Sequence, residues 1–219
     1  MNSAKSNPPL LRLYGSNGSG SAAIEAALTL CGADYRVVTA ATWEPESALA
    51  ELRSANALQQ IPTLVLPDGS VLTESAAILI HLGLEHPASG LLPADPAARA
   101  QAIRGLVFIA ANCYAAIGVI DYPERWCAEA DDAVTKNLRR GARARLHHCW
   151  DMFADAFGAP LAFFGGIAPG ALDIHAAVVS RWSGARAHLK RERPALHALL
   201  ERVDAHPLLA PIFARHWPA

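Results

Sequence analysis

The sequence has few of the features that mark secreted or membrane-bound proteins. Its 219 residues contain only four cysteines, which lie far apart and form no CxxC pair. A disulfide framework is therefore not expected, and the reducing cytoplasm is the expected compartment. Residues 1–9 are polar and lack the apolar segment of a signal peptide. Because no unbroken apolar run approaches the ~18 residues of a membrane span, we expect no membrane association.

An excess of charge of one sign is also lacking. The chain has 19 basic and 20 acidic residues, so its net charge of −1 predicts no nucleic-acid partner. The one cluster of metal-ligand residue types is His147, His148 and Cys149. These residues are consecutive, so on a helix they point in different directions, and no metal site is expected.

The first 84 residues show alternating strand and helix patterns. Ile24, Ala27, Leu28 and Cys31 lie at helical spacing, and Gly32 follows where a helix would end. The order is β-α-β-α-β-β-α, with strands over 10–14, 35–39, 63–66 and 70–72 and helices over 21–31, 46–54 and 75–84. The first crossover requires parallel strands and the last pair is a hairpin, so we predict a mixed sheet covered by helices.

The rest of the chain shows no convincing strand. Residues 85–96 are rich in proline and small residues and indicate a linker. Helical patterns follow over 97–120, 131–157, 171–189 and 194–204. The prediction is an α/β domain over residues 1–84, a linker over 85–96 and an all-α domain over 97–219.

One motif is more specific than the element order. It reads NALQQIPTL from Asn56 to Leu64 and DGSVLTESAAI from Asp68 to Ile78. It is similar to the pattern N-P-x-G-Q-V-P-x-L … D-G-x-x-L-x-E-S-x-A-I of the cytosolic glutathione transferases, and the chain resembles their bacterial, beta-like and theta-like classes over nearly its whole length. The resemblance implies a thioredoxin-like domain followed by an all-α domain, glutathione as co-substrate and a homodimer.

In this family the two ends of the motif face one bound peptide. The resemblance implies a cis Ile61-Pro62 bond that leaves the backbone of Ile61 free to pair with extended glutathione. From the residues alone, a trans proline at the start of an edge strand stays open. The resemblance also places Gln60 and Asn17 among the glutathione-binding residues.

Glu74 and Ser75 stand where a helix begins. Free N–H groups and the helix dipole favour an anion there, while a carboxylate can accept from an ammonium group. A γ-glutamyl group carries both charges. The alternative is a plain helix cap made by Thr73 or Ser75.

The position that activates the thiol falls in the Ser/Gly-rich loop after the first strand. Family members place a Tyr, Ser or Cys there to hold the glutathione sulfur as thiolate. Ser19 is the first candidate, followed by Ser16 and Ser21, with the Asn17 amide as a further donor. A turn without a catalytic hydroxyl stays open. The loop lacks the GxxxxGK[ST] pattern of a phosphate cradle, and it has no cysteine for a mixed disulfide.

Two expectations concern the helical domain. The family's buried-helix segment has a Ser/Thr N-cap and an Asp three residues later; here Gly170 holds the cap and Asp173 is expected to bind the backbone N–H of Gly170. The family's apolar substrate pocket lies between its two domains. The candidates for its lining are Tyr14, Phe108, Ala111, Tyr114 and Trp126.

The sequence therefore predicts a glutathione transferase that attacks a small apolar electrophile with the glutathione thiolate. Two alternatives stay open: a glutathione-transferase-like binding or structural protein without turnover, and a glutathione-dependent reductase or isomerase.

Overall fold

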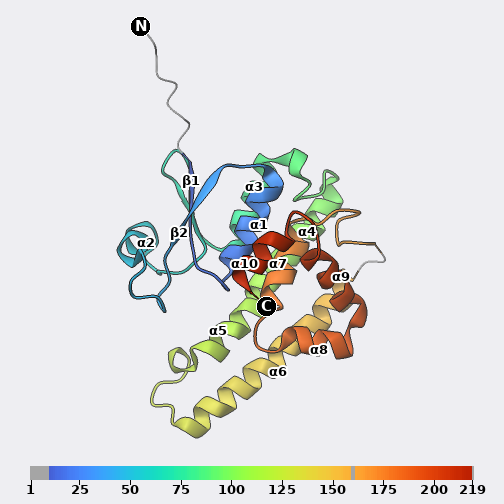
Figure 1. Cartoon of the computed structure of the whole chain (residues 1–219). Coiled ribbons are helices and arrows are strands. Elements are labelled where there is room, and N and C mark those ends of the chain that lie inside the picture. The colour runs from blue at the N-terminus through green and yellow to red at the C-terminus, as the bar shows by residue number, and fades with distance from the viewer. Residues whose placement is uncertain (1–9, 159–160, 219) are drawn as a thin grey trace. The chain divides into compact units, whose positions relative to one another are not determined.

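The structure is a computed structural model that describes residues 10–158 and 161–218 (Figure 1). It divides into two compact units, which we describe separately. The first joins the described residues up to Ser89 with those from Leu208 onward, and the second runs from Gly90 to Pro207. The division predicted from the sequence placed residues 97–219 in one domain, whereas the residues from Leu208 pack with the first unit.

The first unit is built on a four-stranded mixed sheet. The strands β1 (Leu11–Gly15), β2 (Tyr35–Thr39), β3 (Thr63–Val65) and β4 (Val71–Leu72) lie in the order β2-β1-β3-β4. β1 and β2 are parallel, and the other two pairs are antiparallel. The predicted thioredoxin-like arrangement is confirmed.

Helices α1 (Ser21–Cys31), α2 (Leu49–Ala55) and α3 (Ser75–Glu85), the 3-10 turn η1 (Pro87–Ser89) and α10 (Ala210–His216) complete this unit. α1 is buried from Ser21 to Leu28 and packs against both α3 and α10. Gly32 ends it in the left-handed region with φ +62°, as the sequence indicated.

Two helices in this unit differ from the prediction. The helix expected over 46–54 starts at Leu49, because the Ser47 hydroxyl donates to the backbone oxygen of Glu44 and accepts from the Ala41 N–H. These bonds hold the preceding residues in a turn. α10 was not predicted at all, since its seven residues are too few for a clear periodic pattern.

The second unit is helical, as predicted. It contains α4 (Pro96–Phe108), the π-helical segment η2 (Ile109–Tyr114), α5 (Ala115–Asp121), the 3-10 turn η3 (Pro123–Arg125), α6 (Asp132–Phe157), α7 (Ala171–Val179), α8 (Ala185–Glu192) and α9 (Pro194–Asp204). Every residue of α7 is buried, against α4, η2 and α9. The single helix expected over 171–189 is broken into α7 and α8, because Ser183 and Gly184 adopt positive φ angles.

The segment Pro96–Asp121 is a continuous 26-residue helix whose most apolar 18-residue window has a mean hydropathy of 1.8. This helix is long and apolar enough to cross a membrane, but buried core helices of soluble proteins meet the same criteria of length and composition. This helix contains no unbroken apolar run of ~18 residues, so it was not expected as a candidate span. In the structure this helix packs against α6 and α7.

The start of α7 carries the predicted backbone contact of Asp173. One carboxylate oxygen accepts from the Gly170 N–H at 2.9 Å, and the other accepts from the Phe164 N–H at 2.9 Å. A side chain at position 170 would lie 2.9 Å from the Leu91 carbonyl oxygen. This close approach explains why glycine stands where the family pattern has Ser or Thr.

Asp173 is 1% exposed. Burial raises the pKa of its carboxyl to about 6, although the two backbone hydrogen bonds oppose this. A raised pKa in the folded state means that the folded protein binds the proton more tightly. The resulting stabilisation is complete below the ordinary pKa and is lost as the pH rises through about 6.

We therefore predict that Asp173→Asn removes a pH dependence of folding. The free energy of unfolding of the parent, relative to that of the variant, should fall by roughly 3 kcal/mol between about pH 4 and about pH 7. Urea titrations across this range measure it, with Asp34→Asn at an exposed position as the control. A difference between parent and variant that does not change with pH would contradict the assignment.

Candidate functional site

Strand register brings three predicted segments to one end of the sheet in the first unit. Tyr14 pairs with Thr63, so the residues just after β1 and those just before β3 leave the sheet at the same end. Leu64 pairs with Leu72, so the residues after β4 leave at that end too. The Ser16–Gly20 loop, Ile61-Pro62 and Glu74-Ser75 therefore share this end, where α1 and α3 also begin.

The Ile61-Pro62 bond is cis, as the resemblance implies. The turn before it is held by buried polar groups that the sequence analysis did not assign. The Gln60 carbonyl accepts from Asn56 Nδ2 at 3.1 Å and from Thr63 Oγ1 at 2.8 Å, and Asn56 also donates to Thr63 at 3.0 Å. Between the described residues no hydrogen bond uses the backbone N–H or C=O of Ile61.

Glu74 occupies the N-cap of α3 with φ +65°, a left-handed conformation that costs a non-glycine residue about 1–3 kcal/mol and often marks a functional site. Its side chain is exposed, whereas Ser75 is 9% exposed. No side chain caps this helix in the described part of the chain, and its first turn has no acidic residue. The simple cap that the sequence left open is thus not formed.

The three serines of the first loop are all buried. The Ser19 hydroxyl donates to the Ser16 carbonyl at 2.7 Å and shares a hydrogen bond with the Ser21 hydroxyl at 2.9 Å. Ser21 is fully buried, and the Ser16 hydroxyl donates to the Glu44 carboxylate. Each hydroxyl therefore has a partner within the chain, while the Asn17 side chain is exposed.

A second network reaches this loop from α10. The Gly18 N–H donates to His216 Nδ1 at 3.1 Å, and His216 Nε2 lies 2.7 Å from Glu25. Sequence analysis missed Glu25, His216 and Glu44. Glu25 had a signal that could have found it, because it is the one charged residue in the otherwise apolar and neutral helix α1.

The residues predicted for the apolar substrate pocket are divided between the two units. Tyr14 is 2% exposed in the core of the first unit and donates to Glu51 at 3.3 Å. Phe108 packs against Phe153 and Phe157, and Tyr114 stacks on His175. Each of these three side chains has packing contacts within its own unit, and its role in a substrate pocket stays a prediction.

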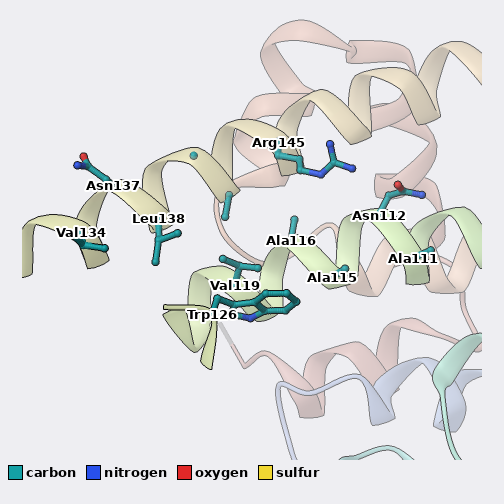
Figure 2. Close-up of a pocket in the computed structure, with 12 residues that line it drawn as sticks. Ala111, Asn112, Ala115, Ala116, Val119, Trp126, Val134, Asn137, Leu138 and Arg145 are labelled. Carbon is teal, nitrogen blue, oxygen red and sulfur yellow. The ribbon is translucent and has the colours of Figure 1, made fainter. Parts of the chain in front are cut away.

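Ala111 and Trp126 do line one pocket, of about 670 Å³, within the second unit. Figure 2 shows it between the helix that carries Ala111, Ala115 and Val119 and the facing helix that carries Leu138 and Arg145. The Trp126 ring lies beside Val119, and Arg145 is the charged residue of the lining. The pocket therefore suits an apolar molecule.

The end of the sheet can bind an anion. The start of α3 points its first backbone N–H groups there and has no acidic residue in its first turn. α1 also begins there without an acidic residue, but the N–H groups of Ser21, Ala22 and Ala23 already donate to Ser19 and Gly20. Nearby, Glu74 offers a carboxylate for a cation. Within residues 10–158 and 161–218, no group of three or more His, Cys, Asp or Glu side chains is placed to hold a metal ion.

Comparison with known proteins gives a consistent result. Residues 21–84 match the glutathione S-transferase N-terminal domain. The chain is 35% identical over 130 residues to the uncharacterized GST-like protein YncG of Escherichia coli strain K12, which is 59% of this chain and 63% of that protein. It is 40% identical over 79 residues to a probable maleylacetoacetate isomerase of Caenorhabditis elegans, which is 36% of each chain.

The aligned segments thus span less than two thirds of the length of both curated relatives. A solved structure with similarity over almost its entire length is a glutathione transferase homologue from Sulfitobacter with bound glutathione. Its TM-score is 0.80 at 20% identity, with 93% of this chain and 97% of that chain covered. Residues 21–84 thus match the N-terminal domain of the glutathione S-transferases, and the chain has the same fold as the solved glutathione transferase homologue.

Proposed function

We propose that the chain binds glutathione at the end of the sheet, activates its thiol and transfers it to an apolar electrophile. The observation that supports this most is the convergence of Ile61, Glu74 and Ser75, whose unused polar groups match an extended peptide with a charged γ-glutamyl end. The glutathione bound to the Sulfitobacter homologue agrees with this ligand.

The middle of glutathione pairs with the backbone of Ile61 in this proposal. Its N–H and C=O have no partner in the described residues, and an extended peptide could use both as an added strand does. The bonds from Asn56 and Thr63 to the Gln60 carbonyl hold this backbone in place before any ligand arrives. Such preorganisation lowers the entropy cost of binding.

The γ-glutamyl end lies at the start of α3. Its carboxylate accepts from the free N–H groups and the Ser75 hydroxyl, and its ammonium group donates to Glu74. Gln60 and Asn17, both exposed, supply further polar contacts at the same end of the sheet.

The sulfur lies at the start of α1. A free thiol titrates near ~8.5, so catalysis at neutral pH requires stabilisation of the thiolate. The helix start supplies part of it and a hydroxyl donor the rest. Ser19 is the first candidate donor; Ser16 and Ser21 follow. Each would have to exchange its present acceptor for the sulfur.

The other components of the proposal follow from the family. An apolar electrophile agrees with the pocket that Ala111 and Trp126 line, whereas the roles of Phe108, Tyr114 and Tyr14 in binding it stay predictions. A homodimer and a cytoplasmic location stay predictions too.

A second candidate is glutathione-dependent isomerisation. It is favoured by the 79-residue similarity to a probable maleylacetoacetate isomerase, and it would use the same glutathione site without consuming glutathione. The internal partners of the three serine hydroxyls favour the further alternative of binding without turnover. Assays of net glutathione consumption with aryl halides, and of isomerisation with a cis-dienoic acid, separate the three activities.

The γ-glutamyl assignment predicts two graded losses of affinity. Glu74→Gln removes a charged acceptor and should weaken glutathione binding about 10-fold to 100-fold, while Ser75→Ala should weaken it about 3-fold to 10-fold. Calorimetric titration with S-methylglutathione measures both. Glu85→Gln, at the other end of α3, is the matched control and should bind like the parent. Parent-like binding by Glu74→Gln would rule out this orientation of the peptide.

The thiol assignment predicts that one serine matters most for chemistry. Ser19→Ala should raise the pKa of the bound thiol and lower kcat about 10-fold or more, with little change in glutathione affinity. Ser16→Ala and Ser21→Ala identify the donor if Ser19 is not it, and Ser54→Ala, on the exposed face of α2, is the control. Thiolate absorbance against pH gives the pKa. Equal activity in all three loop variants would remove the serine hypothesis.

A further inference from the structure

The loop after β1 is tied at its midpoint to the last helix of the chain. Gly18 has φ +72° and donates its backbone N–H to His216 Nδ1 at 3.1 Å, across 198 positions of sequence. The two residues belong to the same compact unit. This bond therefore fixes the course of the loop that carries Ser16 and Ser19.

His216 uses both of its ring nitrogens. Since Nδ1 accepts from Gly18, it carries no hydrogen, and the ring proton of the neutral imidazole sits on Nε2. Nε2 donates to Glu25 Oε1 at 2.7 Å. His216 is 4% exposed, so little water is available to replace either partner. The Glu25 carboxylate therefore favours the imidazole tautomer with its proton on Nε2, which leaves Nδ1 free to accept from the Gly18 N–H.

Glu25 is suited to this task because it stays charged inside α1. Burial would raise the pKa of its carboxyl, but the hydrogen bonds from His216 and Arg215 and the positive charge of Arg215 outweigh burial and hold the pKa below its ordinary value. Arg215 contacts the other oxygen, Oε2, at 2.8 Å. Glu25 is 5% exposed and Arg215 reaches it from the partly exposed side of α10.

We infer that His216, oriented by Glu25, is a positioning residue for the thiol-activating loop. The inference rests on the proposed function for its catalytic consequence, though not for its geometry. The first two candidate donors, Ser19 and Ser16, lie within two residues of Gly18, and their separation depends on the Ser19 N–H to Ser16 carbonyl bond in the same turn. A loop released at Gly18 would lose the donor geometry that thiolate stabilisation requires, because small displacements strongly reduce catalysis.

Two substitutions separate the two bonds of His216. In His216→Gln the side-chain amide can reach Glu25 from the place of Nε2, but nothing replaces the acceptor at Nδ1. In His216→Asn the amide oxygen can replace Nδ1 and accept from Gly18, but Glu25 loses its donor. The histidine of the His197–Glu201 pair on α9 provides the matched control, His197→Gln.

We expect His216→Gln to keep its urea midpoint close to that of the parent while amide hydrogen exchange at Gly18 rises about fivefold or more. Its kcat should fall and its bound-thiol pKa should rise, with the KM for glutathione unchanged. His216→Asn should show the reverse: slow exchange at Gly18 and nearly parental kcat, but a lowered urea midpoint. His197→Gln should match the parent in exchange and kcat.

The inference is overturned, and the proposed function is not, if His216→Gln binds and turns over glutathione with the same kcat and the same amide exchange rate at Gly18 as the parent. Faster exchange in His216→Gln that leaves both kcat and the bound-thiol pKa unchanged would also overturn it. If the parent neither binds nor uses glutathione, the proposed function fails instead. In that case the exchange data on the two variants still decide whether His216 holds the loop.

Discussion

The pairing of β1 with β3 is the constraint on which the proposed site depends. Tyr14 opposite Thr63 sets the end of the sheet at which the first loop and Ile61-Pro62 emerge, and Leu64 opposite Leu72 adds Glu74 to the same end. A slip of one residue would turn every side chain of β3 to the other face of the sheet. It would also shift Ile61, which precedes β3, relative to the loop after β1. Leu13 and Leu64 are cross-strand partners and both are fully buried, so a slip would disrupt this buried pair.

The same end of the sheet collects complementary electrostatic features. Two helix starts there lack acidic residues, and in the proposed binding mode they favour the carboxylate and the thiolate of glutathione while Glu74 favours its ammonium group. The polar groups that shape the backbone nearby are themselves buried and hydrogen-bonded, as Asn56 and Thr63 show. The site therefore combines rigid supports with unused groups at its surface, which is the arrangement that ligand binding favours.

Local patterns predicted most of the fold, and they identified the candidate binding residues that the strand register brings to one end of the sheet. The helix over Ser21–Cys31, the hairpin and the turn into α3 all follow from spacing within about 20 residues. The hydrogen bonds that hold the candidate catalytic loop could not be predicted, because the partners of Ser16, Gly18 and Glu25 come from Glu44 and His216. No periodicity in a single sequence reports contacts over such separations, and α10 itself is too short to show one. The break at Ser183 and Gly184 was missed for a different reason. The spacing of apolar residues continues through these two positions, so the sequence predicted one unbroken helix.

The central claim is that the end of the sheet recognises the γ-glutamyl end of glutathione. Calorimetric titration of the unaltered chain with two dipeptide fragments, γ-glutamylcysteine and cysteinylglycine, tests it most directly. The account predicts that γ-glutamylcysteine keeps most of the binding free energy of glutathione and that cysteinylglycine binds at least about 10-fold more weakly. The claim is contradicted if cysteinylglycine binds more tightly than γ-glutamylcysteine. It is also contradicted if neither the two fragments nor glutathione bind.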